Sequence, residues 1–234
     1  MTPSPQILAL GGHGFFPERP EEMRKLDDLI LELTGKERPR MLFVPTASAE
    51  DLSYIVMVYA AFAGRADVAH CRFFPWPPPD VRELVLSQDA IYVGGGNTAN
   101  MLAIWRLHGF DALLREAWES GILLCGSSAG MICWFEAGVT DSFGPELDGM
   151  RDGLGLLPGS ACPHYDGEEL RRPRYHELVR SGFPAGVAAD DGAGLLYQGT
   201  DLAEVVSCFD GSRAYRVELV DGEVRETPLE SRLL

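Results

Sequence analysis

The stretch Gly126-Ser127-Ser128-Ala129-Gly130 has the pattern Gly-x-Ser-x-Gly and joins a short apolar run at 122–125 to a second apolar segment, which is predicted to be helical. In a nucleophile elbow this pattern holds its central serine in a strained turn between a strand and a helix. The flanking glycines let neighbouring backbones approach closely. Ser128 would then stand at the carboxyl end of the strand, and the Ala129 amide would begin the helix. The same residues could instead form only a helix N-cap, which serine also favours.

A serine hydroxyl is a weak nucleophile and needs a base within hydrogen-bonding reach, itself held by a third group. Among the five histidines, His164 is the expected base because it follows an apolar segment and stands just after Pro163, which restricts the chain beside it. His13 lies in a glycine-rich loop and is the second candidate. Structural or surface roles are expected for the remaining histidines, His70, His108 and His176.

The third member of such a site should be a carboxylate, and its place in the chain order is not fixed, because unrelated triads use different orders. Asp141 lies between Ser128 and His164, whereas Asp191 follows both and comes after an expected strand at 187–189. If that strand is parallel, its loop lies at the same edge of the sheet as the elbow. An ordinary Asp-Gly turn is the alternative for Asp191.

Acyl transfer also requires hydrogen-bond donors for the oxyanion. The Ala129 N–H is one expected donor, and the second should come from Gly95 or Gly96 of the triple glycine at 94–96. A phosphate-binding turn is the alternative, but the Gly-x-Gly-x-x-Gly pattern and a Walker lysine are both missing. No metal or other cofactor is expected, since the sequence has no His-Glu-x-x-His motif and no clustered Cys and His ligands.

Short apolar runs alternate with helical patterns in the first half of the chain, which predicts βαβ units and a parallel sheet with helices on both faces. Ligands bind beyond the carboxyl ends of such strands, so the glycine loops at Gly11, Gly94 and Gly126 should converge on one crevice. Before the elbow strand we expect strands at 7–10, 41–44, 69–74 and 90–93, and helices at 21–33, 54–63, 81–87 and 101–118.

After the elbow the composition and patterning of the sequence change. The segment 139–155 is rich in Gly, Asp and Ser and is predicted to be an ordered loop. Asp-Gly turn signals then separate short expected strands, which predict an antiparallel C-terminal edge to the sheet; they lie at 187–189, 194–198, 204–207, 214–219 and 223–227. With no linker-like segment, the 234 residues are expected to form a single domain.

Composition narrows the classes of partner. The chain has 20 Lys and Arg against 35 Asp and Glu, a net charge of −15, so neither nucleic acid nor an anionic membrane is an expected partner. Five scattered cysteines without Cys-x-x-Cys spacing are typical of a reducing, cytoplasmic location. The N-terminus lacks a signal-peptide pattern and no apolar run approaches ~18 residues, so we expect neither export nor a membrane span.

Together these motifs resemble those of a known family. Val-Gly-Gly-Gly-Asn-Thr at 93–98, Gly-Ser-Ser-Ala-Gly at 126–130 and Cys-Pro-His at 162–164 occur in the order seen in the S51 serine peptidases, which include peptidase E, an aspartyl dipeptidase, and the cyanophycinases. The resemblance extends over residues 7–195. It implies a three-layer α/β/α sandwich of the class I glutamine amidotransferase-like kind, with a Ser nucleophile, a His base and a carboxylate.

The resemblance also implies roles for individual residues. Ser128 matches the nucleophile and His164 the base, while Asn97 matches a position near the site and Gly95 with Ala129 match the oxyanion donors. Cyanophycinase-like members carry an acidic residue after a late strand, and Asp191 stands there in place of the usual Glu. This favours Asp191 over Asp141 as the carboxylate.

The implied activity is that of a cytoplasmic serine exopeptidase acting on dipeptides or short peptides, with possible selectivity for N-terminal aspartate, as a monomer or homodimer. The segment 134–141 departs from the peptidase E pattern, which bears on specificity. Arg171, with Arg172 and Arg174, could bind an acidic substrate side chain or could be a solvated basic stretch. Two other hypotheses are a non-hydrolytic protein that binds peptides or small molecules, and an amidotransferase-like enzyme that uses Cys125.

Overall fold

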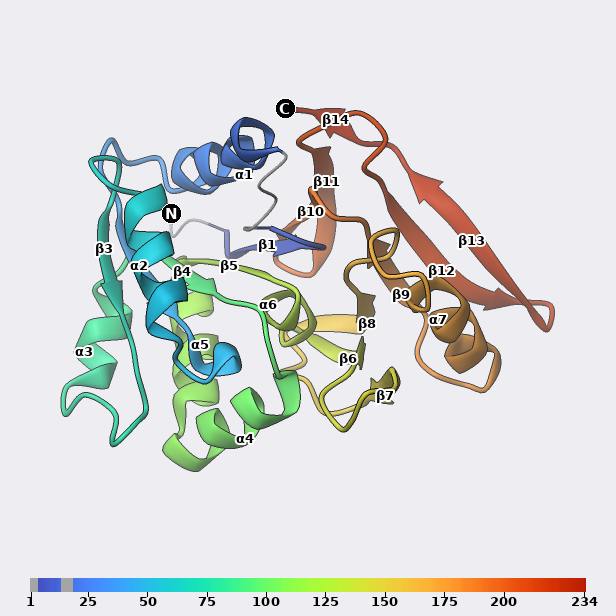
Figure 1. Ribbon diagram of the computed structural model, residues 1–234, viewed down its shortest axis with the longest axis horizontal. Helices are drawn as coiled ribbons and strands as arrows, with labels where there is room; N and C mark the ends of the chain where they lie inside the picture. The colour runs from blue at the N-terminus through green and yellow to red at the C-terminus, as the bar shows by residue number, and fades with distance from the viewer. Residues whose placement is uncertain (1–3, 14–18) are drawn as a thin grey trace.

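The computed structural model describes residues 4–13 and 19–234 and is built on an eight-stranded sheet (Figure 1). Its strand order is β14-β11-β10-β1-β5-β4-β2-β3. The five strands from β1 to β3 in this order are mutually parallel, whereas β10 is antiparallel to β1 and β11 is antiparallel to β10. The strand bounds are β1 (Gln6–Leu10), β2 (Arg40–Val44), β3 (Asp67–His70), β4 (Ala90–Val93), β5 (Leu123–Ser127), β10 (Ala193–Gln198), β11 (Asp201–Ser207) and β14 (Arg232–Leu233).

Helices cover both faces of this sheet because alternate residues of its strands point to opposite sides. On one face, α1 (Pro20–Leu33) and α2 (Leu52–Ala61) pack against side chains such as Leu8 and Phe43. The opposite face, which includes Ile7 and Leu124, packs against the remaining helices of the first half. These are α3 (Val81–Leu86), α4 (Thr98–His108), α5 (Phe110–Glu119) and α6 (Ala129–Ile132), while a short 3-10 turn, η1 (Thr46–Ser48), follows β2.

A second sheet of six strands, in the order β13-β12-β9-β8-β6-β7, lies beside the first (Figure 1). Its strands β6, β8 and β9 are parallel, and β7, β12 and β13 are added antiparallel. Helix α7 (Arg171–Arg180) packs on it through Tyr175 and Val179. The strand bounds are β6 (Phe135–Thr140), β7 (Asp148–Met150), β8 (Leu157–Cys162), β9 (Gly186–Ala189), β12 (Ala214–Val220) and β13 (Glu223–Leu229).

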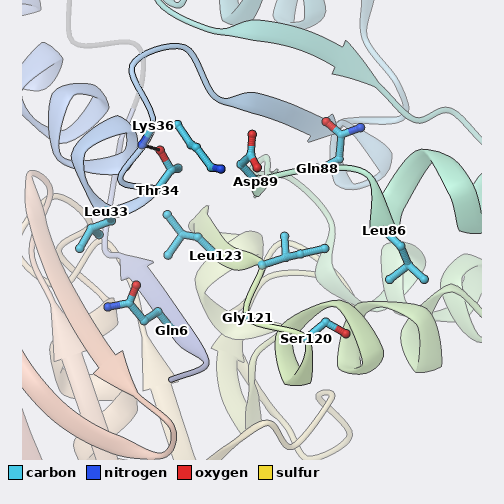
Figure 2. A pocket seen from close by; sticks show the side chains of 11 residues that line it. Gln6, Leu33, Thr34, Lys36, Leu86, Gln88, Asp89, Ser120, Gly121 and Leu123 are labelled. Carbon is cyan, nitrogen blue, oxygen red and sulfur yellow. Dashed lines mark hydrogen bonds between the residues drawn. The ribbon is translucent and has the colours of Figure 1, made fainter. Parts of the chain in front are cut away.

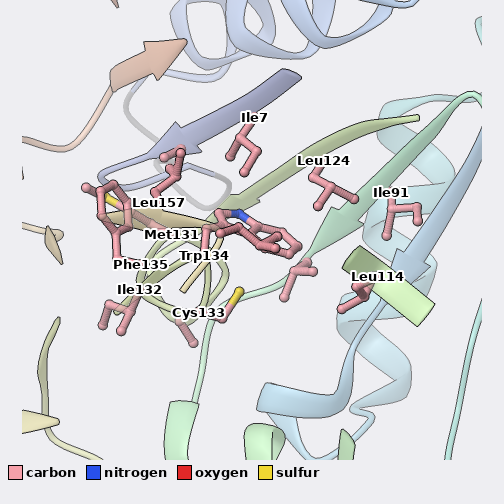
Figure 3. Close-up of a cluster of buried hydrophobic side chains, with 14 of the residues drawn as sticks. Ile7, Ile91, Leu114, Leu124, Met131, Ile132, Cys133, Trp134, Phe135 and Leu157 are labelled. Carbon is pink, nitrogen blue, oxygen red and sulfur yellow. The ribbon is translucent and has the colours of Figure 1, made fainter. Parts of the chain in front are cut away.

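The two sheets share one apolar cluster. Figure 3 shows Trp134, which follows α6, among side chains of both sheets, including Ile7 and Leu124 of the first and Phe135 and Leu157 of the second. Trp134 is fully buried. Burying so large an aromatic surface is worth several kcal/mol, by the rule of about 25 cal/mol per Å². The elbow region and its following tryptophan therefore tie the second sheet to the first.

The α/β class and the strand–helix alternation up to β5 are confirmed, and β10 and β11 form the expected antiparallel edge. The expectation that all late strands join that edge is wrong, because β9, β12 and β13 belong to the second sheet. The expected loop at 139–155 is also wrong, since β6 extends to Thr140 and β7 occupies Asp148–Met150. Strand pairing across the chain, which local composition does not reveal, decides both cases.

Two element boundaries also differ from expectation, for local reasons. The expected helix at 101–118 is two helices, because Gly109 adopts φ +67° and caps the first of them. The third strand stops at His70 rather than continuing to Phe74. The amides of Phe73 and Phe74 are instead bound by the buried carboxylate of Glu50. Within the described ranges, no helix has the length and apolar character needed to cross a bilayer.

Replacing Gly130 by alanine is expected to lower the free energy of unfolding by about 1–3 kcal/mol. A Cβ on Gly130 would overlap the Val93 carbonyl oxygen and lie 3.0 Å from the Val93 Cβ, so the backbone of α6 or β4 would have to shift. Chemical denaturation would compare this variant with Gly144→Ala, where a Cβ would meet no atom within 4 Å. Equal stability of the two variants would contradict the close packing of α6 on β4.

Candidate active site

Ser128 lies between the end of β5 and the start of α6, with φ +59° and ψ −112°. A residue with a side chain rarely adopts a positive φ, so this conformation is strained. Close backbone contacts enforce it: a Cβ on Gly126 would lie 2.6 Å from the Gly130 carbonyl oxygen and 2.8 Å from that of Val93. Ser128 is partly exposed, whereas Ser127 before it is buried. This is the strand–turn–helix geometry of a nucleophile elbow.

The imidazole of His164 is hydrogen-bonded to the carboxylate of Asp191, with 2.6 Å between Nδ1 and Oδ1. Their side chains are 22% and 14% exposed. His164 follows β8 and also has a positive φ, +52°, and Asp191 follows β9. With Asp191 ionised, its carboxylate accepts from Nδ1–H, which leaves Nε2 as a proton acceptor. Asp141, the other candidate carboxylate, is exposed just after the end of β6, and no hydrogen bond or ion pair among the described residues joins it to His164.

Three successive carbonyl groups at the end of β1 hold the backbones of these residues. The Leu10 carbonyl accepts the Ser128 N–H at 3.2 Å, and the Gly11 carbonyl accepts the His164 N–H at 3.2 Å. The Gly12 carbonyl accepts the N–H of Gly192, the residue after Asp191, at 2.9 Å. The 10–12 loop therefore fixes where the serine, the histidine and the carboxylate lie relative to one another.

Gly11 and Gly12 have no room for a side chain. A Cβ on Gly12 would overlap Asp191 Oδ1 and lie 3.0 Å from His164 Nδ1. A Cβ on Gly11 would lie 2.7 Å from the backbone carbon of Ala189. Sequence reasoning noted the glycines as a flexible loop near a ligand but missed their contact with the histidine–aspartate pair. The adjacent glycines after an apolar strand were the available signal.

The glycine loop, residues 94–96, lies on the other side of Ser128. A Cβ on Gly95 would be 3.3 Å from the Ser128 Cβ and 3.7 Å from its Oγ. The Gly95 N–H donates to the Tyr54 hydroxyl at 3.4 Å. Gly96 has φ +133°, and a Cβ on it would overlap the Ala47 carbonyl. Among the hydrogen bonds of the described residues, none uses the N–H of Gly96 or of Ala129.

Asn97 has a capping role in this structure. Its Oδ1 accepts the N–H of Asn100 at 2.8 Å and thereby caps α4. Its Nδ2 donates to the Ser142 carbonyl at 3.0 Å, which ties the start of α4 to the segment after β6. The side chain named from the family resemblance thus lies next to the glycine loop, with its amide engaged in these two contacts.

The contacts of Arg171 fit neither of the two alternatives raised for it, substrate binding or a solvated basic stretch. Arg171 is 3% exposed, its Nε donates to the Glu168 carboxylate at 2.8 Å, and one of its terminal nitrogens donates to the Val139 carbonyl at 2.8 Å. Arg172 lies over the rings of Tyr165 and Tyr215, and Arg174 pairs with Asp148 and Glu177. The arginines of α7 therefore hold this helix against the second sheet.

The surroundings of His13 and Cys125 bear on the two remaining candidates for the chemistry. His13 uses both ring nitrogens, one toward Tyr92 and one toward Asp27, each at 3.0 Å. Cys125 is fully buried in β5, where burial raises the pKa of its thiol well above the ordinary value. A thiol kept protonated in the core is a poor nucleophile, so the arrangement favours Ser128.

Asp190, beside Asp191, is a buried carboxyl group of unusual character. Burial, followed by the negative charge of Asp166, raises its pKa to about 7, although the backbone N–H of Arg213 donates to it. Its Oδ1 has no partner among the described residues. The Asp191 backbone N–H is bound by Asp166 at 3.0 Å. The carboxylate that faces His164 is therefore the one of Asp191, and Asp190 lies behind it.

One pocket lies far from these residues. It is lined by Gln6 at the start of β1, Leu123 at the start of β5 and Asp89 just before β4 (Figure 2). Ser128 follows the opposite end of β5, so this pocket occupies the amino-terminal edge of the parallel strands. In the part of the chain that the structure describes, no group of three or more His, Cys, Asp or Glu side chains is suited to hold a metal ion.

Comparison with known proteins gives consistent matches. The model of Peptidase family S51 matches residues 7–205. Uncharacterized peptidase YgaJ of Bacillus subtilis (strain 168) is 47% identical over 231 residues, which cover 98% of this chain and 99% of that protein. Peptidase E of Shewanella denitrificans is 29% identical over 201 residues, 81% of each chain.

Two solved structures share the fold. A peptidase from an acI-B1 Actinobacterium has a TM-score of 0.69 at 16% identity and covers 98% of this chain and 96% of its own. A putative peptidase E of Listeria monocytogenes EGD-e has a TM-score of 0.57 at 18% identity and covers 97% of this chain and 100% of its own.

The raised pKa of Asp190 predicts a pH dependence of stability. The folded chain keeps this proton up to about pH 7, whereas the ordinary pKa is 3.8, so the folded state binds more protons between these values. Stability should therefore fall as the pH rises through this range and level off above it. In Asp190→Asn this contribution disappears, which urea denaturation at several pH values would detect. If the free energies of unfolding of the wild type and of Asp190→Asn changed with pH in the same way, the raised pKa of Asp190 would be contradicted.

The buried contacts of Arg171 predict a structural effect. Arg171→Met should lower the free energy of unfolding by about 1–3 kcal/mol, because the Val139 carbonyl is left buried without its donor. Arg174→Met is the matched control on the same helix; its side chain is 33% exposed, and we expect a change of about 1 kcal/mol or less. If Arg171→Met proved as stable as the control, the structural role would be wrong.

Proposed function

Because the chain belongs to peptidase family S51, a family of serine peptidases, we propose that it is an exopeptidase that hydrolyses the first peptide bond of dipeptides or short peptides. The observation that carries this proposal is the 2.6 Å hydrogen bond between His164 and Asp191. The 10–12 loop binds the backbone N–H groups of Ser128, of His164 and of the residue after Asp191, so one segment holds both the pair and the serine. The family implies a class I glutamine amidotransferase-like fold. We further propose that the chain acts as a single domain, in keeping with the apolar cluster common to both sheets.

In the proposed reaction, Ser128 Oγ attacks the carbonyl carbon of the peptide bond, and His164 Nε2 takes the serine proton. Asp191 holds the Nδ1–H and stabilises the imidazolium that forms. The imidazolium then protonates the leaving amine as the acyl-enzyme forms. A water molecule, activated by the same Nε2, releases the product acid and restores Ser128.

The oxyanion of the tetrahedral intermediate needs donors on both sides of Ser128. We assign one to the Ala129 N–H at the start of α6, where the dipole of the first turn favours negative charge. The second is an N–H of the glycine loop: Gly95, sharing its proton between Tyr54 and the oxyanion, or Gly96. The contact of Gly95 with Ser128 supports this side for the oxyanion.

Selectivity for an acidic first residue is not assigned to Arg171, because its guanidinium is occupied by Glu168 and Val139. A preference for Asp-X dipeptides is tested by varying the first residue of the substrate. We also propose a reducing, cytoplasmic location, since all five cysteines are free and buried. We propose that the chain acts as a monomer or a homodimer.

Hydrolysis of a panel of dipeptides and aminoacyl-amides that differ in the first residue tests the proposal. Ser128→Ala and Asp191→Asn should each lower kcat by a factor of at least about 10³, since both act in the same chemical step. Ser120→Ala, at the far end of the sheet, is the control and should keep wild-type activity. Labelling by a fluorophosphonate should be lost in Ser128→Ala, strongly slowed in Asp191→Asn and unchanged in Ser120→Ala.

The panel also separates the alternatives. Activity confined to Asp-X would define an aspartyl dipeptidase, and serine-dependent activity on other residues would keep the mechanism with a different selectivity. A wild-type protein that neither hydrolyses any member of the panel nor takes the label would overturn the proposal in favour of a non-hydrolytic protein that binds peptides or small molecules.

A further inference from the structure

A buried chain of polar side chains runs from α1 to the glycine loop, and the proposed mechanism does not use it. Asp27 of α1 contacts His13 Nε2 at 3.0 Å, and His13 Nδ1 contacts the Tyr92 hydroxyl at 3.0 Å. The side chain of Tyr92 interacts with that of Tyr54 on α2. The Tyr54 hydroxyl in turn accepts the Gly95 N–H at 3.4 Å. The chain ends beside Ser128, because Gly95 lies against that residue.

These groups are polar in an apolar setting. Tyr92 is 2% exposed within β4, and its ring stacks on Phe43 with 5.9 Å between centroids. The Tyr54 ring packs edge-on against the same Phe43 and closely over Gly94. Burial raises the pKa of both tyrosines, so both hydroxyls keep their protons at neutral pH. Buried hydroxyls need partners: the Tyr92 hydroxyl has His13 Nδ1, and the Tyr54 hydroxyl has the Gly95 N–H.

Donor chemistry fixes the direction of the last bond in this chain. The Gly95 N–H can only donate, so the Tyr54 oxygen faces it as an acceptor. In the His13 tautomer that carries its proton on Nε2, this N–H donates to Asp27 and Nδ1 accepts from the Tyr92 hydroxyl. Chains of this kind strengthen their members by mutual polarisation.

We propose that Tyr54, held by Tyr92, His13 and Asp27, is a positioning residue that fixes the Gly95 peptide group beside Ser128. The inference rests on the proposed hydrolysis at Ser128 for its catalytic consequence. Three glycines in a row have unusual backbone freedom, so the glycine loop needs an external anchor to keep its donors oriented. A preorganised donor matters most when the oxyanion forms, so loss of the anchor should act on kcat rather than on KM.

The test compares Tyr54→Phe and Tyr92→Phe with the matched control Tyr59→Phe. Tyr59 lies on the same helix, and its hydroxyl contacts His70 at the surface at 2.9 Å. On the best peptide of the panel we expect kcat to fall about tenfold to a hundredfold in Tyr54→Phe, less than loss of a donor itself. KM should stay near the wild-type value. Tyr92→Phe should change kcat in the same direction, and Tyr59→Phe should change neither constant.

A second readout does not need turnover. Hydrogen exchange of the Gly95 amide, followed by NMR in the ligand-free protein, should be faster in Tyr54→Phe and in Tyr92→Phe. In Tyr54→Phe the exchange of the β4 amides and the Tm should stay unchanged. If the wild type proves inactive toward every peptide and unlabelled, the proposed function fails, yet this exchange rate still decides whether Tyr54 anchors the loop.

Two results would overturn the inference. One is an exchange rate of the Gly95 amide in Tyr54→Phe that equals the wild-type rate, whether or not turnover can be measured. The other is a loss of kcat accompanied by a higher KM, a lower Tm and faster exchange throughout β4, which would indicate general structural damage. Tyr54 is only partly buried, so its variant should fold even if Tyr92→Phe does not.

Discussion

The arrangement of the candidate site depends on the hydrogen bonds made by the 10–12 loop. Leu10, Gly11 and Gly12 direct their carbonyl groups to three chain segments that are far apart in sequence. A backbone amide bonded in this way cannot move without its partner, and an unpaired buried carbonyl would cost free energy. Because β1 lies between β5 and β10 in the first sheet, the loop at its end is itself anchored on both sides. Small displacements of one segment are therefore transmitted to the others.

Ser128 and His164 both have a positive φ, and each such conformation costs about 1–3 kcal/mol. Such conformations persist only where the surroundings leave no alternative. For Ser128 the surroundings are Gly126, Gly130 and the Val93 carbonyl; for His164 they include the hydrogen bond from its own N–H to Gly11. The proposed acid–base chemistry thus sits on a backbone held rigid by packing and not by the side chains that would react.

Much of this site could be predicted from the sequence, because its signals are local. The Gly-x-Ser-x-Gly turn, the Cys-Pro-His segment and the Asp after a late strand each occupy a few residues, and the pairing of His164 with Asp191 agrees with the preferred choice over Asp141. The second sheet was missed, since strand pairing brings together residues far apart in the chain. The buried position of Arg171 was not foreseen for a related reason: its partner Val139 lies on a strand that composition had suggested to be a loop.

The division of the site between two sheets has a consequence for when the site is completed during synthesis and folding. Ser128 comes from the first sheet, whereas His164 and Asp191 follow β8 and β9 of the second, which needs β12 as a neighbour. During synthesis the serine leaves the ribosome well before the last of these strands. Under the proposed mechanism, a nascent or truncated chain carries a nucleophile without its base. Hydrolytic capacity would then arise only on completion of folding, which protects neighbouring peptides from an immature enzyme.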